Sequence, residues 1–232
     1  MKDNVLIVSE KFYSIQGEGR TVGTPAVFLR LAGCNLLCKS NDWVCDSIEV
    51  WQKGIPTPFN EILTGELFEA LVNGAHLIIT GGEPLLHQKN IVEYLHWFRT
   101  NFGWSPTVEI ETNGTVIPTD FIMEYVTYWN VSPKLPNAGE PHVKRVNEVA
   151  LKKLNTDKTI YKFVISKEID YIDLLQDYSH LIDMSKVWLM PAGATQDELN
   201  SSRLTVVELC KRMYHHYTDR THIVIWNKKT GV

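Results

Sequence analysis

The chain has 232 residues, of which 44% are hydrophobic and 22% are charged, and its formal net charge is −4. This composition excludes a disordered or fibrous protein and predicts one folded domain over residues 1–232. Because binding to phosphate groups needs a basic face, the weakly acidic balance argues against direct contact with nucleic acid.

The predicted elements alternate between β-rich runs and helical patterns along the chain. Strands are predicted at residues 26–31, 76–80, 107–111, 128–131, 160–165, 187–190 and 222–226. Helices are predicted at residues 64–73, 88–101, 119–125, 143–154, 169–178 and 196–217. Such alternation is typical of parallel strands with right-handed crossovers. We therefore predict an α/β fold, a partial TIM-like barrel of about six parallel strands with outer helices.

The cysteines indicate a metal centre. Cys34, Cys38 and Cys45 follow the first of these strands, and three thiolates can hold a 4Fe-4S cluster while one iron keeps no protein ligand. A structural zinc ion would need a fourth ligand, such as the distant His87. Cys210 lies among apolar residues at helical spacing and is predicted to be a core residue.

The expected cellular location of the protein is consistent with cysteines that form no disulfides. No run of eighteen apolar residues occurs, and the N-terminal sequence Met-Lys-Asp-Asn lacks a signal-peptide pattern. We therefore expect a cytoplasmic protein with no membrane partner, in a compartment that keeps cysteines reduced.

Motifs rich in glycine, proline and asparagine follow several strands, where parallel sheets gather their chemistry. They are the sequences at residues 81–84, 112–114, 132–134 and 191–193. Each of them alone is also ordinary loop punctuation. Their position after successive strands, together with the cysteines, predicts one active site.

These motifs resemble the radical S-adenosylmethionine superfamily and, within it, the 7-carboxy-7-deazaguanine synthase family. The resemblance covers nearly the whole chain and rests on residues 12–19, 28–36, 45–47, 80–84, 111–114, 132–134 and 226–232. One departure is the spacer between Cys38 and Cys45, which has six residues instead of two. Val44 also occupies the place of the aromatic residue that normally precedes the third cysteine.

The resemblance implies a set of ligands for each group. The 4Fe-4S cluster is expected on Cys34, Cys38 and Cys45, and Mg²⁺ on Ser47. S-adenosylmethionine is expected to contact Val44, Cys45, Asp46, Gly82, Glu83, Ser132, Pro133 and Lys134. The pterin substrate is expected to contact Ile15, Gln16, Gly17, Glu18, Arg30, Thr80 and Val232.

Three of these residues also have ordinary structural interpretations. By residue type alone, Arg30 also fits a paired buried charge, Lys134 a surface lysine and Glu83 the cap of a turn. No side chain is predicted to be catalytic, because in this family the cofactor carries the radical.

The activity that the resemblance implies is a radical ring contraction. A carbon–nitrogen lyase of this kind converts 6-carboxy-5,6,7,8-tetrahydropterin to 7-carboxy-7-deazaguanine with loss of ammonia, in queuosine-type 7-deazapurine biosynthesis. The expected partners are an electron donor such as a flavodoxin and a second copy of the chain in a homodimer. The alternatives are a glycyl-radical activase acting on a partner protein and a non-catalytic metal-binding module.

Overall fold

The computed structural model describes residues 4–40, 44–45, 47–229 and 231–232. Its strands are β1 (Val5–Ile15), β2 (Pro25–Leu31), β3 (Ile55–Pro58), β4 (His76–Gly81), β5 (Val108–Thr112), β6 (Tyr128–Val131), β7 (Thr159–Ile165), β8 (Val187–Pro191) and β9 (His216–Tyr217). Its α-helices are α1 (Ile48–Trp51), α2 (Phe59–Ile62), α3 (Glu66–Val72), α4 (Gln88–Phe102), α5 (Asp120–Tyr125), α6 (His142–Arg145), α7 (Glu148–Leu154), α8 (Glu168–Tyr178), α9 (Gln196–Met213) and α10 (Thr221–Trp226). Short 3-10 turns occupy Gly19–Thr21, Pro84–His87, Pro136–Ala138 and Met184–Lys186.

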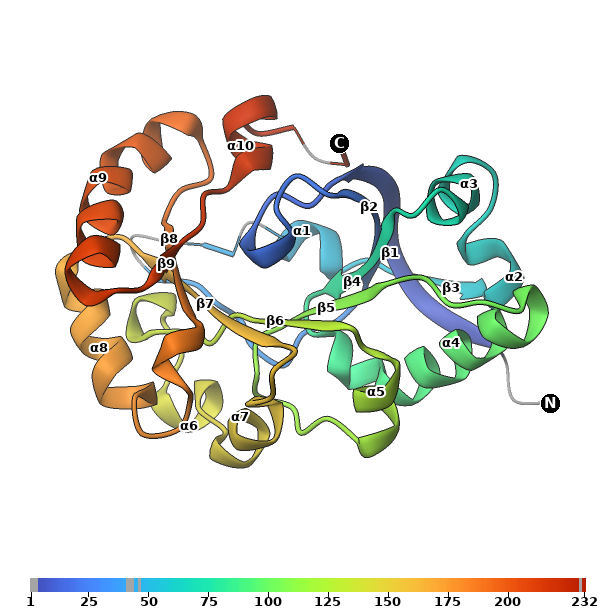
Figure 1. Cartoon of the computed structure of the whole chain (residues 1–232), viewed down its shortest axis with the longest axis horizontal. Helices are drawn as coiled ribbons and strands as arrows, with labels where there is room; N and C mark the ends of the chain where they lie inside the picture. Colours follow the sequence, from blue (N-terminus) through green and yellow to red (C-terminus); the bar gives the residue numbers. More distant parts are fainter. Residues whose placement is uncertain (1–3, 41–43, 46, 230) are drawn as a thin grey trace.

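The strands form one nine-stranded sheet in the order β3-β1-β2-β4-β5-β6-β7-β8-β9. Every pairing from β2 to β9 is parallel, whereas β1 runs antiparallel to both β2 and β3. The sheet is open, because β3 and β9 are its two edges. It is curved, with α3, α4, α5, α7, α8 and α9 outside it and α10 at the opening (Figure 1).

The two faces of the sheet differ in chemistry. The face toward the helices carries alternate apolar side chains, such as Val108 and Ile110 of β5, that belong to the main hydrophobic core. The intervening positions face the concave side and include the buried polar residues Glu109, Asn130 and Lys162. Because successive side chains of a strand point to opposite faces, one buried strand can serve both a core and a polar site.

The sheet has nine strands, more than the seven that the sequence predicted. The long β1 was missed although Leu6 and Val8 alternate with less buried residues, and the short β3 and β9 were missed too. β1 forms an antiparallel hairpin with β2, in which Ile15 lies opposite Pro25. Antiparallel pairing allows such a short return, so no crossover helix marked β1 in the sequence.

The final predicted strand, at residues 222–226, is wrong, because this segment is helix α10. The place beside β8 is taken by β9, in which His216 pairs with Trp188. In α10 only Ile223 is buried, whereas Val224 and Ile225 are exposed. Tertiary context therefore outweighs the β-propensity of this apolar run.

Two predicted helices have different bounds. The helix expected at residues 143–154 is divided, because Asn147 has an extended backbone and its side chain accepts from the N–H of Ala150, which starts α7. The helix expected at residues 196–217 ends at Met213, where Tyr214 adopts a left-handed conformation with φ 58°. Elsewhere the predicted helices and strands agree with the structure to within a few residues.

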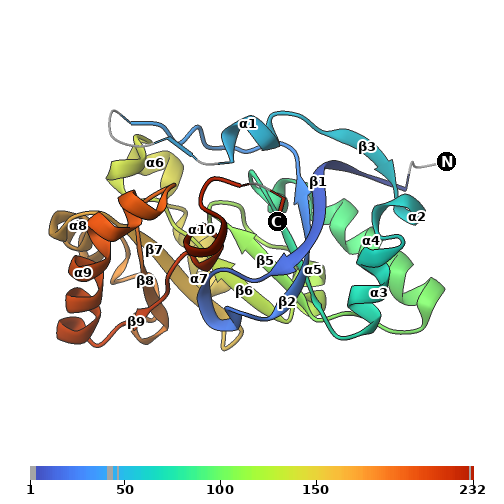
Figure 2. The same cartoon turned by 90° about the horizontal axis from the view of Figure 1, so that it is seen from above.

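No α-helix within the described residues is both long and apolar enough to span a membrane. Helix α1, in the connection from β2 to β3, lies along one edge of the sheet (Figure 2). This edge lies at the carboxyl ends of the parallel strands, where the sequence placed the active site.

Candidate active site

Three cysteines converge in the loop between β2 and α1. Cys38 is buried with Leu36 and Ala138 in a small apolar cluster, and Cys34 and Cys45 pack against it. All four cysteines of the chain are free, and Cys210 belongs instead to the main core, as predicted.

The lengthened spacer does not separate the second thiol from the third. Lys39 and Val44 form an isolated antiparallel bridge, and the N–H of Cys45 donates to the carbonyl of Cys38 over 3.0 Å. The bridge closes the base of the spacer. The extra residues therefore leave Cys38 and Cys45 as neighbours, in keeping with the slow rise of loop-closure entropy with length.

The environment of the thiols opposes ionisation in the metal-free protein. Burial raises the pKa of Cys38 to about 11, and it also raises the pKa of Cys34. Neighbouring thiolates add to both effects, whereas the ammonium group of Lys134 lowers both pKa values. Iron that binds thiolates would displace these protons.

The three thiols fit the donor set of a 4Fe-4S cluster, which leaves one iron without a protein ligand. Among the residues that the structure describes, no three His, Cys, Asp or Glu side chains are gathered closely enough to hold one metal ion. A 4Fe-4S cube sets a different requirement, because each thiolate binds a different iron atom.

The Gly-Gly-Glu-Pro turn at the end of β4 packs directly against the cysteine loop, which lies between β2 and α1. Gly82 donates its N–H to the carbonyl of Leu31 over 3.3 Å, and Glu83 donates its N–H to Gly33 over 2.9 Å. A Cβ on Gly82 would overlap the carbonyl of Gly33 and lie 2.6 Å from the Cβ of Cys34. Glycine is therefore required by close approach of the two loops.

The carboxylate of Glu83 is fully buried and holds this turn to β5. It accepts from the backbone N–H groups of Leu85 and Asn113, at 3.0 and 2.7 Å, and from the hydroxyl of Thr112 at 2.8 Å. Burial raises the pKa of Glu83, and these three donors oppose the rise. Glu83 thus joins the turn after β4 to the loop after β5, in agreement with its interpretation as a turn cap.

An amide network continues from β5 to the first cysteine. The side-chain amide of Asn113 donates to Asn35 over 3.0 Å and lies 4.0 Å from the sulfur of Cys34. Asn35 in turn donates to the hydroxyl of Thr115 over 2.7 Å. Hydrogen bonds near cluster sulfurs are one of the means by which proteins tune such clusters.

Pro133 and Lys134, in the Ser-Pro-Lys segment after β6, line a cavity of about 520 Å³. Lys134 donates to the hydroxyl of Ser132 over 3.3 Å, and its own carbonyl accepts from Tyr178 at 2.6 Å. Pro133 and Lys134 form one wall, and Ala192 and Gly193, after β8, form another. The cavity has the size of a small-molecule site and adjoins the cysteine loop through Ser40 and Ala138.

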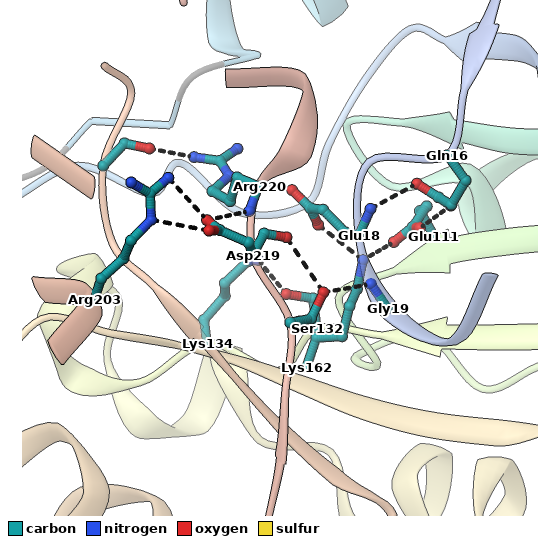
Figure 3. Close-up of polar contacts among 12 residues, drawn as sticks. Gln16, Glu18, Gly19, Glu111, Ser132, Lys134, Lys162, Arg203, Asp219 and Arg220 are labelled. Carbon is teal, nitrogen blue, oxygen red and sulfur yellow. Dashed lines mark hydrogen bonds and ion pairs between the residues drawn. The ribbon is translucent and has the colours of Figure 1, made fainter. Parts of the chain in front are cut away.

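A network of charged groups occupies the concave face of the sheet (Figure 3). The ammonium group of Lys162 lies 2.9 Å from a carboxylate oxygen of Glu18 and 2.7 Å from one of Glu111. The amide of Gln16 donates to Glu111 over 3.1 Å, and Arg220 lies 3.1 Å from the other oxygen of Glu18. Gln16 and Glu18, both predicted to bind substrate, therefore share one network.

The pKa values of the charged groups in this network are shifted in different directions. Burial tends to raise the pKa of Glu18, but Lys162, Arg220 and His222 together hold it well below its usual range. For Glu111 burial is the stronger effect, and its pKa is raised despite Lys162. Burial tends to lower the pKa of Lys162, and the two carboxylates reverse this and raise it. Glu18 is therefore ionised at neutral pH.

The other predicted substrate residues lie around this network or on its edge. Gly17 packs so closely on the ring of His222 that a Cβ there would overlap its Nδ1 atom. Arg30 and Thr80 are neighbours in register on β2 and β4. The Nε atom of Arg30 lies 2.7 Å from Glu10, so the arginine is ion-paired in this structure. A guanidinium group has five N–H donors, and binding of a carboxylate by Arg30 stays a prediction.

The remaining predicted residues that the structure describes lie at the end of β1, before α1 and at the C-terminus. Ile15 ends β1, and Val232 is half-buried at the C-terminus. Val44 is 48% exposed, and Ser47 is half-buried immediately before α1. Asp46 lies outside the described residues.

Sequence reasoning missed Glu111, Lys162 and Arg220 as site residues. Glu111 and Lys162 did carry a signal, because each is a charged residue in a strand that alternates with buried apolar residues. Arg220 carried none, since it belongs to a short connection between β9 and α10.

A family model described as a 4Fe-4S single cluster domain matches residues 15–119. A 7-carboxy-7-deazaguanine synthase from Halobacterium salinarum is 33% identical over 249 aligned residues, covering 96% of this chain and 91% of the relative. A protein of the same name from Pyrobaculum aerophilum is 33% identical, covering 97% of this chain and 96% of the relative. The crystal structure of QueE from Escherichia coli superposes with a TM-score of 0.68 at 24% identity, covering 94% and 95% of the two chains.

Proposed function

The chain belongs to the 7-carboxy-7-deazaguanine synthase family, and from this premise we propose the reaction and the residues that serve it. The protein is a radical S-adenosylmethionine lyase that uses a 4Fe-4S cluster. It contracts the ring of 6-carboxy-5,6,7,8-tetrahydropterin to 7-carboxy-7-deazaguanine and releases ammonia, a step of queuosine-type 7-deazapurine biosynthesis. The open, mostly parallel sheet of nine strands supports a partial TIM-like barrel as the architecture for this chemistry.

The cysteine edge of the sheet binds the cofactors. Cys34, Cys38 and Cys45 hold the cluster, and the cluster with S-adenosylmethionine supplies the radical that takes a hydrogen atom from the substrate. The turn at Gly82 and the cavity beside Lys134 hold S-adenosylmethionine. Glu83 keeps these loops in place through three accepted hydrogen bonds. Val44, Asp46 and the segment at residues 132–133 complete the proposed cofactor contacts.

The concave face binds the pterin. The ionised carboxylate of Glu18 and the amide of Gln16 face the aminopyrimidine edge, where paired hydrogen bonds recognise N–H and carbonyl groups. Arg30 binds the substrate carboxylate with donors other than its Nε atom. The remaining proposed contacts are Ile15, Gly17, Thr80 and the C-terminal Val232.

Three further partners belong to the proposal. Ser47 provides a hydroxyl oxygen to Mg²⁺, a hard cation that also accepts the substrate carboxylate. An electron donor such as a flavodoxin reduces the cluster. Two copies of the chain form a homodimer.

One observation carries the proposal: the three predicted cysteines pack together in one small cluster in spite of the long spacer, and Cys34 of this group lies against the turn at Gly82. The test is anaerobic reconstitution with iron and sulfide, followed by incubation with the pterin, S-adenosylmethionine, Mg²⁺ and a reductant. We expect the deazaguanine product and ammonia in equal amounts. A reconstituted protein that cleaves S-adenosylmethionine without forming this product would contradict the assigned substrate.

Arg30→Ala separates this reaction from that of a glycyl-radical activase. We expect pterin turnover to fall by at least about tenfold, because a charge-assisted bidentate contact contributes about 1.5–3 kcal/mol. Iron content should stay at the wild-type value, since Arg30 lies on β2 and pairs with Glu10. Equal turnover by wild type and Arg30→Ala would remove Arg30 from the substrate site.

A further inference from the structure

The connection between β9 and α10 crosses the open side of the sheet and binds the loop after β1. The N–H of Gly19 donates to the hydroxyl of Thr218 over 2.7 Å, and the N–H of Thr221 donates to the carbonyl of Gly17 over 2.9 Å. These contacts join segments that are about two hundred residues apart in sequence, 199 in the case of Gly19 and Thr218. The loop that carries Gln16 and Glu18 is therefore fixed by the C-terminal part of the chain.

Arg220 stands at the centre of this connection and contacts two loops. Its Nε atom donates to Glu18 over 3.1 Å, and its Nη1 atom donates to the carbonyl of Gly193 over 2.6 Å. The side chain of Arg220 is only 12% exposed. One guanidinium group thus joins the substrate loop after β1 to the loop after β8 (Figure 3).

The backbone of Arg220 is itself held in place. Its N–H donates to Asp219 over 2.8 Å, and Asp219 is ion-paired with Arg203 of α9 at 2.9 Å. The planar guanidinium presents its donors in a fixed fork, so it can serve two acceptors at once. A displacement of either loop therefore moves the guanidinium group and alters its hydrogen bond to the other loop.

The two loops belong to different ligand sites. Glu18 lies on the concave face, where its second carboxylate oxygen is held by Lys162 at 2.9 Å. Gly193 lines the cavity of about 520 Å³ that also contains Pro133 and Lys134. Burial of the carboxylate is offset by the two cations, which keeps Glu18 ionised and the bridge to Arg220 intact at neutral pH.

We propose that Arg220 is a positioning residue that couples substrate binding at Glu18 to cofactor binding in the cavity beside Gly193. This inference rests on the proposed function, because it takes the two ligands from it. A ligand in either site restrains one end of the bridge, so the second ligand meets a loop that is already ordered. The coupling is reciprocal by linkage: each ligand increases affinity for the other by the same factor.

The test measures affinities of the reconstituted enzyme by anaerobic calorimetry without reductant. The Kd of S-adenosylmethionine is determined alone and with saturating 6-carboxy-5,6,7,8-tetrahydropterin. For wild type we expect the pterin to lower this Kd by at least about fivefold, the lower end of typical coupling. For Arg220→Gln the two Kd values should agree within about twofold, less than that typical coupling.

Arg220→Lys distinguishes the bridge from charge alone. It keeps a cation beside Glu18, but a point ammonium on a flexible stem lacks the fork needed for both acceptors. We expect this variant to retain pterin binding and to lose most of the coupling. Thermal unfolding of each variant shows whether the fold is kept, and Arg220→Lys supplies the answer if Arg220→Gln does not fold.

Arg212→Gln is the matched control, because Arg212 is an exposed arginine paired with Glu168 at 3.0 Å, away from both loops. It should show the wild-type ratio of Kd values. Absence of coupling in wild type, or an unchanged ratio in both Arg220 variants, would overturn the inference while leaving the reaction intact. Failure of wild type to bind the pterin at all would instead reject the assigned substrate, and the coupling with it.

Discussion

At the scale of single residues, the site depends on positions where a small change in shape or charge has no room to relax. Gly82 is such a position, because its missing Cβ lets the turn after β4 approach Gly33 and Cys34. Glu83 is another, since its buried carboxylate accepts three hydrogen bonds and joins two loops. We therefore expect both residues to affect cluster binding through the geometry of the cysteine loop.

Gly82→Ala should reduce cluster incorporation. The added Cβ would overlap the carbonyl of Gly33 and come within 2.6 Å of Cys34, so the cysteine loop must move. We expect iron and sulfide per chain after anaerobic reconstitution to fall below half of wild type. Gly103→Ala is the control, because Gly103 caps α4 with φ 75° and has open space around its Cβ position. It should lower stability by about 1 kcal/mol and leave iron content unchanged. Full iron content in Gly82→Ala would show that the two loops can separate without harm.

At the scale of elements, the strands of the sheet bring the site residues together, and the connection after β9 holds the loop after β1 in place. Thr218 of this connection is buried and accepts from the N–H of Gly19, which follows the predicted substrate residues. The short helix α10 then places His222 against Gly17. These contacts place the helix, which forms instead of the expected seventh strand, against the loop after β1.

Thr218→Val should destabilise the protein by about 1–3 kcal/mol, because it leaves the buried N–H of Gly19 without its acceptor. The free energy of unfolding in urea measures this loss. Thr100→Val, on the exposed surface of α4, removes a hydroxyl that bonds only to the carbonyl of His96 within the same helix. That control should stay within about 0.5 kcal/mol of wild type. Equal stability of Thr218→Val and wild type would mean that water or a shifted backbone satisfies Gly19.

At the scale of the whole molecule, the buried ion network makes stability depend on pH in opposite senses at its two carboxylates. The folded pKa of Glu18 is lowered, so its contribution is present above the unfolded pKa of about 4.3 and is lost as pH falls further. The folded pKa of Glu111 is raised by burial, so the stability linked to it decreases as pH rises through about 4.3 and above. The two effects can be separated by removing one carboxylate at a time.

The difference in unfolding free energy between wild type and Glu18→Gln should be constant from pH 7 to about pH 5 and shrink below about pH 4. For Glu111→Gln the advantage of wild type should instead shrink as pH rises from about 4. Urea unfolding at stepwise pH values measures both. Glu124→Gln, at an exposed position of α5, controls for loss of one negative charge. A Glu18→Gln difference that grows on acidification would contradict the lowered pKa of Glu18.

The amino-acid sequence by itself determined the features that depend on local chemistry. The three cysteines, the Gly-Gly-Glu-Pro turn and the strands at residues 26–31 and 76–80 follow from residue type, spacing and hydrophobic pattern, which neighbouring residues are sufficient to define. The buried position of Cys210 was predictable in the same way.

Only the tertiary structure decided the features that depend on partners distant in sequence. Lys162 meets Glu18 across 144 positions and Arg220 meets it across 202, and no local pattern specifies such pairs. A distant contact also decides why residues 221–226 form a helix where the sequence predicted a strand. The place beside β8 in the sheet is already taken by β9. Local propensity sets which elements a segment can form, and competition for places in the folded sheet sets which one it does form.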